Sequence, residues 1–159
     1  MKPTLFLLLI FSTLIYSQDD KIRAIEEQGV IVGIQTWSFR TMTDQSPLAI
    51  LNYIKQTGIK QVELMGNHAE PFVGIFEDSE NISKLRNEVA ITKLKELKKL
   101  YDDAGISIFA FKPRRCFEKY NTDDEIRYGM RAAKVLGASH ITLEHPSDDE
   151  HTLRLSKIA

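Results

Sequence analysis

The chain has 159 residues, of which 43% are hydrophobic, 27% charged and 9% aromatic, as in one globular domain and unlike a disordered or collagen-like chain. Twenty-one basic and twenty-two acidic side chains give a net charge of −1. Nucleic-acid-binding domains usually have a clear basic excess, so we expect no nucleic-acid partner. The single cysteine, Cys116, excludes an internal disulfide and a multi-cysteine zinc site.

Residues 1–18 have the pattern of a secretory signal peptide. Lys2 provides a positive charge, an apolar segment runs from Leu5 to Tyr16, and the small residue Ser17 follows it. The apolar run of roughly 12 residues is shorter than the about 20 needed to cross a bilayer. We expect cleavage near Gln18, no membrane segment in the mature chain 19–159, and a periplasmic or secreted location. A buried N-terminal strand or helix is the alternative.

Strand-like and helix-like segments alternate in the first half of the mature chain. The apolar run Val30–Trp37 predicts a first strand. Ser46 and Pro47 then provide an N-cap and a first-turn proline for a helix that ends at Gly58. The segment Ile59–Met65 predicts the second strand.

The same order of helix, glycine and strand recurs in the second half. A helix ends at Gly105, and the third strand is predicted over Ile106–Phe111. Thr122–Glu125 matches a capping box, and the helix that it starts ends at Gly137. The fourth strand is predicted over Ser139–Glu144.

A further capping box at Ser147–Glu150 predicts a fourth helix, which runs to Ala159 without a glycine cap. We expect a chain interrupted within its fold. Strands that alternate with helices predict a parallel sheet, and the apolar third and fourth strands predict a sheet covered on both faces. Two architectures stay open, an open doubly wound sheet and half of an eight-stranded barrel. No glycine-rich phosphate-binding motif follows the first strand, so a nucleotide-binding version is not supported.

Polar side chains follow each predicted strand at its carboxyl end, where binding groups gather in parallel α/β folds. Their chemistry suits a small hydroxylated or anionic ligand. The set comprises Trp37, Arg40, Glu63, Asn67, His68, Lys112, Arg114, Arg115, Glu144 and His145.

Each of these residues also has a structural explanation. Glu63 lies within an apolar strand, so its carboxylate needs a cationic partner, a metal or a polar site. His145 is a candidate metal ligand or sugar hydrogen-bonding group, and otherwise a loop histidine. His68 lies in the long segment between Gly66 and Asn81, a candidate lid. Trp37 is either a platform for a sugar ring or part of the core.

The basic segment Lys112–Arg115 is either an anion site or a solvated loop. Cys116 follows it without a recognisable base partner, so no nucleophile is proposed there.

Three segments, Gly33–Arg40, Gly58–Leu64 and Ala133–Ala138, resemble in order the sugar phosphate isomerase/epimerase family, whose members have the xylose-isomerase-like barrel. The resemblance covers the chain from about Val30 onward. It implies an α/β fold of parallel βα units, the first four units of a TIM (β/α)₈ barrel, preceded by the signal peptide. It also implies a divalent metal (Mn, Mg or Zn), a small sugar or sugar-phosphate ligand, and aldose–ketose isomerisation or epimerisation.

Such a reaction removes a proton next to a carbonyl and returns it, with a carboxylate base and a metal that stabilises the ene-diolate. In the family, the main metal ligands come from strands five to eight, which this chain lacks. Catalytic residues are therefore unassigned, and the chain alone is expected to be inactive and either poorly soluble or dimeric. The resemblance implies substrate-binding roles for Trp37, Glu63, His68, Lys112 and Glu144, and a metal-binding role for His145.

Three alternatives remain. The first is a non-catalytic sugar-binding half barrel that forms a homodimer, and the second is an open-sheet structural domain. The third is a hydrolase similar to the apurinic endonucleases, which His145–Pro146 resembles. Against the third, Lys112 stands after the third strand where that branch has a histidine.

Overall fold

The structure is a computed structural model that describes residues 27–144, 146 and 148–159. The predicted signal peptide and His145 lie outside the described residues. Within the described part of the chain, no helix is long and apolar enough to cross a membrane.

Four parallel strands form one sheet in the order β1-β2-β3-β4. Each strand pairs with the next one along the chain, Gln35 opposite Glu63, Leu64 opposite Phe111, and Ala110 opposite His140. The strands are β1 (Gly33–Gln35), β2 (Gln61–Met65), β3 (Ser107–Lys112) and β4 (His140–Ile141).

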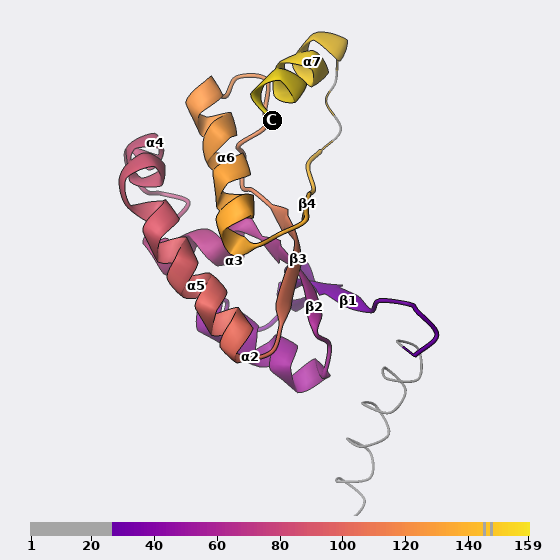
Figure 1. Cartoon of the computed structure of the whole chain (residues 1–159). Helices are drawn as coiled ribbons and strands as arrows, with labels where there is room; N and C mark the ends of the chain where they lie inside the picture. The colour runs from indigo at the N-terminus through magenta and orange to yellow at the C-terminus, as the bar shows by residue number, and fades with distance from the viewer. Residues whose placement is uncertain (1–26, 145, 147) are drawn as a thin grey trace, which may run out of the picture.

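The three long connecting helices lie on the same side of this sheet (Figure 1). They are α2 (Pro47–Thr57), α5 (Ile91–Asp103) and α6 (Asp123–Leu136), and the last helix, α7 (Asp149–Ile158), packs beside α6. A doubly wound sheet has helices on both faces and reverses its strand order. Sequential order with helices on one side is the arrangement of consecutive units in a (β/α)₈ barrel. The fold is thus a parallel α/β fold resembling about half of a TIM barrel, as predicted.

Short-range signals set the helix ends, as the sequence predicts. The Ser46 hydroxyl accepts a hydrogen bond from the Ala49 amide at 3.3 Å, and α2 ends at Gly58 with a left-handed φ of 74°. Both hydrogen bonds of the Thr122–Glu125 capping box are present at the start of α6. At α7 the prediction of a capping box at Ser147–Glu150 is wrong by one residue: the N-cap is Asp148, whose side chain accepts from the His151 amide at 2.7 Å.

The core lies between the sheet and the helices. Its centre includes Val62, Leu64, Ile54, Leu94, Leu97, Tyr101, Phe111 and Leu136. The prediction that the third and fourth strands are covered on both faces is wrong for the described part of the chain, because its helices cover only one face. Phe109, on the other face, is 43% exposed.

Two strands are shorter than predicted. The first ends at Gln35, because Thr36–Phe39 forms a 3-10 turn, η1. The fourth includes only His140–Ile141, and Thr142–Glu144 continue without strand pairing.

The long segment after β2 is folded rather than open. It forms the short helices α3 (Gly66–Ala69) and η2 (Glu70–Val73), and further along α4 (Ile82–Leu85) and a π-helical turn, η3 (Arg86–Ala90), lead into α5. Glu70, Val73 and Ile75 in this segment are buried. The structure therefore gives no support to its interpretation as a lid.

Candidate functional site

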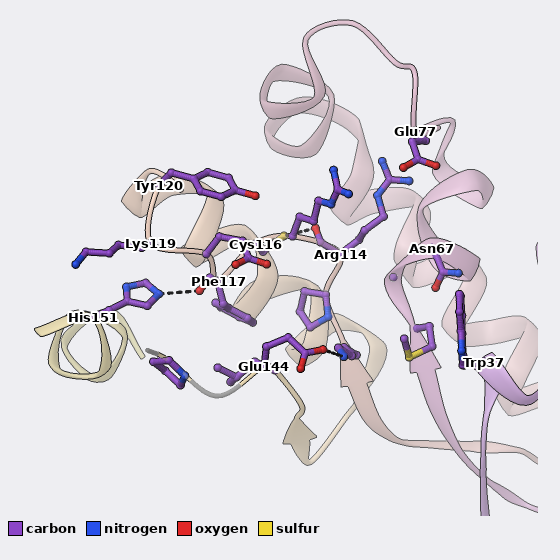
Figure 2. A pocket seen from close by; sticks show the side chains of 18 residues that line it. Trp37, Asn67, Glu77, Arg114, Cys116, Phe117, Lys119, Tyr120, Glu144 and His151 are labelled. Carbon is purple, nitrogen blue, oxygen red and sulfur yellow. Dashed lines mark hydrogen bonds and ion pairs between the residues drawn. The ribbon is translucent and has the colours of Figure 1, made fainter. Parts of the chain in front are cut away.

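A cavity of about 580 Å³ lies where the four strands end (Figure 2). Its walls come from η1, the start of α3, the loop after β3, the segment after β4, and the first turn of α7. The side chains that line it include Trp37, Met65, Asn67, Lys112, Arg114, Cys116, Phe117, Tyr120, Glu144 and His151. This is the end of a parallel sheet at which α/β folds bind their ligands.

Lys112 and Glu144 form an ion pair in the cavity. The Lys112 ammonium donates a hydrogen bond to Oε1 of Glu144. This hydrogen bond and the adjacent positive charge hold the pKa of Glu144 below its usual value of 4.5, so the carboxylate is ionised at neutral pH. Glu144 is 81% exposed, and pairs at such positions contribute little to folding stability. In this cavity the pair places a hydrogen-bond donor, Lys112, beside an acceptor, Glu144.

Glu63 is the centre of a hydrogen-bond network on the uncovered face of the sheet. Its carboxylate accepts from the Gln35 side-chain amide at 2.8 Å and from the Thr142 hydroxyl at 2.5 Å. We call Gln35, Glu63 and Thr142 the strand-end triad. Among the described residues no Lys or Arg forms an ion pair with Glu63, and its hydrogen-bond partners are two neutral donors. The triad lies next to the cavity, because Met65, on the same face of β2, lines it.

Two aromatic side chains border the cavity from different elements. Trp37, on η1, is 45% exposed, which removes the core-packing interpretation of this residue. Tyr120, on the loop between β3 and α6, is 76% exposed and was not singled out in the sequence. Nothing in its sequence context distinguishes it from an ordinary loop tyrosine.

A buried ion pair holds the loop that forms one wall of the cavity. Arg86 donates to Oε1 of Glu70 at 2.9 Å, and these side chains are only 4% and 2% exposed. Arg86 also donates to the Arg114 carbonyl at 2.7 Å, and the Arg114 guanidinium lies 3.3 Å from Oε2 of Glu70. We call Glu70 and Arg86 the loop clamp. Burial raises the pKa of Glu70, and the guanidiniums of Arg86 and Arg114 oppose that rise.

Cys116 follows in the same loop and is fully buried. Burial raises the pKa of its thiol to about 12, so it stays protonated at neutral pH. A buried, protonated thiol is a poor nucleophile.

His68 is buried beside η1 and does not line the cavity. Its Nδ1 lies 2.9 Å from the Thr36 hydroxyl and its Nε2 lies 3.2 Å from Oε1 of Gln45. Burial lowers the pKa of this imidazole. Both ring nitrogens already have protein partners, so the geometry favours a structural role over substrate binding.

His151, which the sequence did not indicate as a site residue, lines the cavity. It is 4% exposed, and its Nε2 lies 2.7 Å from the Phe117 carbonyl. This contact joins α7 to the loop after β3. No pattern in the sequence indicates this partner, which lies 34 residues away along the chain.

No group of three or more His, Cys, Asp or Glu side chains among the described residues is arranged to hold a metal ion. Both carboxylate oxygens of Glu63 are occupied by neutral donors, and His145 lies outside the described residues. The described residues thus do not fit the expected metal.

Comparison with protein-family models finds no match, and no curated protein matches the chain. Among solved structures, the chain is similar to a sugar phosphate isomerase/epimerase from Parabacteroides distasonis ATCC 8503. The two chains are 22% identical with a TM-score of 0.47, over 80% of this chain and 44% of the other. The chain therefore spans less than half the length of that protein.

Proposed function

We propose that the cavity binds a sugar and that the chain serves aldose–ketose isomerisation or epimerisation, the activity that the sequence resemblance implies. The observation that supports this most is that polar side chains from just beyond β2, and from the ends of β3 and β4, line one cavity together with Trp37. Asn67, Lys112 and Glu144 provide neutral and charged donors and acceptors there.

The shape and polarity of the cavity suit a polyhydroxylated ring. Sugar hydroxyls both donate and accept, so they match a site in which Lys112 and Asn67 donate and Glu144 accepts. The C–H face of a sugar ring packs on an aromatic side chain, and Trp37 presents such a surface at the cavity.

The reaction needs a positive charge near the developing oxyanion and a carboxylate near the transferred proton. In our proposal Lys112 stabilises the oxyanion. Glu144 lines the cavity while Glu63 does not, so we assign the acceptance of the proton from the ligand to Glu144. Because its pKa is lowered, the Glu144 carboxylate is a weak base. Sugar binding, which does not depend on proton transfer, is therefore tested before the reaction.

Calorimetric titration of the 159-residue protein with aldoses and ketoses tests the proposal. We expect saturable binding that Lys112→Met and Glu144→Gln each weaken, while Lys99→Met, at an exposed pair on α5, leaves it unchanged. The proposal is contradicted if no sugar binds saturably, or if all three variants weaken sugar binding equally. The sequence predicts that this chain alone is inactive, whereas the proposed roles of Lys112 and Glu144 predict deuterium exchange next to the carbonyl in D₂O. Measuring this exchange with and without Mn²⁺ decides between the two predictions.

A second candidate is a non-catalytic sugar-binding half barrel that forms a homodimer. The uncovered sheet face with the exposed Phe109 favours it. A stable dimer that binds sugar, with no deuterium exchange at any metal concentration, would select this candidate over the first.

A further inference from the structure

His68 connects three segments beside the cavity through a chain of hydrogen bonds. Its Nδ1 lies 2.9 Å from the Thr36 hydroxyl in η1, and its Nε2 lies 3.2 Å from Oε1 of Gln45, in the loop before α2. The Met65 amide at the end of β2 donates to the same Thr36 hydroxyl at 3.0 Å. We call Thr36, Gln45 and His68 the histidine relay.

The partners of the ring determine which nitrogen carries the proton. The Gln45 side-chain amide donates to the carbonyls of Phe39 at 2.8 Å and Met42 at 2.6 Å, and carbonyls can only accept. The Gln45 oxygen therefore faces His68, whose Nε2 donates to it. Nδ1 of the neutral imidazole then accepts from the Thr36 hydroxyl.

The relay holds η1 at both ends. Thr36, at the start of the turn, is fully buried and bonds directly to His68, and the Phe39 carbonyl, at its end, is held through Gln45. Trp37 lies between these two anchors and lines the cavity. The position of Trp37 in the cavity wall therefore depends on a ring that does not itself line the cavity.

Protonation of His68 would disrupt the relay. A second N–H, at Nδ1, would face the Thr36 hydroxyl, whose proton would lose its acceptor in a fully buried position. Burial lowers the pKa of His68, so the ring is neutral at pH 7. Stability gained from such a neutral imidazole is complete above its ordinary pKa of 6.5 and is lost as the pH falls below it.

The two hydrogen-bond partners of the ring are neutral. The charged and titratable groups on the surrounding elements are exposed or contact other residues: Arg40 and Asp44 near η1, Tyr53 and Lys55 on α2, Glu63 on β2 and Glu70 on η2. The response of the ring to pH therefore follows from its burial and from the relay.

We propose that His68 is a positioning residue, which holds Trp37 at the cavity while its ring is neutral and releases it when the ring is protonated. Sugar affinity then falls in acid, because the platform for the sugar ring is no longer held. The effect on sugar affinity rests on the proposed function, whereas the coupling of Trp37 to His68 does not.

NMR titration of the unliganded 159-residue protein from about pH 8 to about pH 5 tests the coupling. The indole N–H resonance of Trp37 should shift with the same midpoint as the His68 ring, below 6.5. His68→Gln offers one acceptor and one donor but does not titrate, so the Trp37 resonance should lose its pH dependence. His68→Leu should give the acid resonance at every pH. His140→Gln, at an exposed histidine outside the cavity lining, should leave the titration unchanged.

Calorimetric titration with D-glucose and D-fructose measures the effect on binding. Affinity should fall about fivefold between about pH 7.5 and about pH 5.5, the size of one lost aromatic contact, and should not fall in His68→Gln. Glu144, whose pKa is lowered from 4.5, stays ionised over this range.

The outcomes separate this inference from the proposed function. A Trp37 resonance that does not follow the His68 titration, or that still titrates in His68→Gln, overturns the inference and leaves sugar binding intact. Equal sugar affinity at both pH values overturns the control of binding by His68. A coupled titration in a protein that binds no aldose or ketose supports the positioning role and contradicts the proposed function.

Discussion

The Lys112–Glu144 pair is the most direct test of the site at the scale of single residues. Lys112 lowers the pKa of Glu144 through its hydrogen bond and its charge. An acid whose pKa is lowered by a partner keeps that interaction above its usual pKa and loses it as the pH falls through the lowered value. Any contribution of the pair to ligand binding should therefore persist at neutral pH and disappear only below about pH 4.5.

Substitution of Lys112 checks this directly. We expect the pKa of Glu144 in Lys112→Met to rise toward 4.5, measured by NMR titration of its side-chain carboxyl carbon. The pKa of Asp148, which Lys119 lowers through a separate hydrogen bond, should not change. An unchanged pKa at Glu144 would show that the pair does not form in solution.

At the scale of secondary-structure elements, the loop clamp joins three segments that are distant in sequence. Arg86→Met leaves the Glu70 carboxylate buried without its closest partner, and breaking a buried pair in this way costs about 3–5 kcal/mol. We expect a loss of that size in the free energy of unfolding, measured by urea denaturation.

The double variant Glu70→Leu with Arg86→Met provides the control. It removes both charges together, so much of the lost stability should return. If the double variant is as unstable as the sum of the single variants, the two side chains do not interact as described.

Helix ends and strand order could be predicted from the sequence because their causes are local. Ser46, Gly58 and Thr122 act on backbone groups within four residues, and their patterns are visible without the fold. The carboxyl ends of parallel strands meet at one edge of the sheet, so the grouping of Trp37, Lys112 and Glu144 could also be predicted.

The unpredicted features depend on contacts between distant residues. Nothing near Glu70 in sequence indicates that its partners are Arg86 and the loop at Arg114. The burial of His68 follows from its contacts with Thr36 and Gln45, on a different segment. The sequence did not indicate that helices cover only one face of the sheet. An apolar strand has the same residue pattern whether or not helices pack on its second face.

At the scale of the whole molecule, no helix of the described residues lies against one face of the sheet. Phe109 is exposed there, and the outer edges of β1 and β4 lack strand partners within the described residues. Such faces and edges favour association. We expect concentration-dependent self-association of the 159-residue protein by sedimentation velocity, reduced by Phe109→Asp and unchanged by Leu153→Asp, at an exposed leucine on α7. A strictly monomeric protein at all concentrations would contradict this.

Export is a prediction that concerns the chain before it folds. The apolar segment Leu5–Tyr16 followed by Ser17 should direct secretion and cleavage. N-terminal sequencing of the exported protein should start close to Gln18. Recovery of intact Met1 from a soluble cytoplasmic fraction would show that the segment is not a signal peptide.

Trp37 is the only tryptophan in the chain, and it lies half exposed at the cavity. The intrinsic tryptophan fluorescence of the protein therefore originates entirely from the candidate site. A ligand that stacks on the indole would shift its emission to shorter wavelength and protect it from quenching by acrylamide. The protein thus has a built-in optical probe, with which large collections of unlabelled carbohydrates can be screened before any enzymatic assay exists.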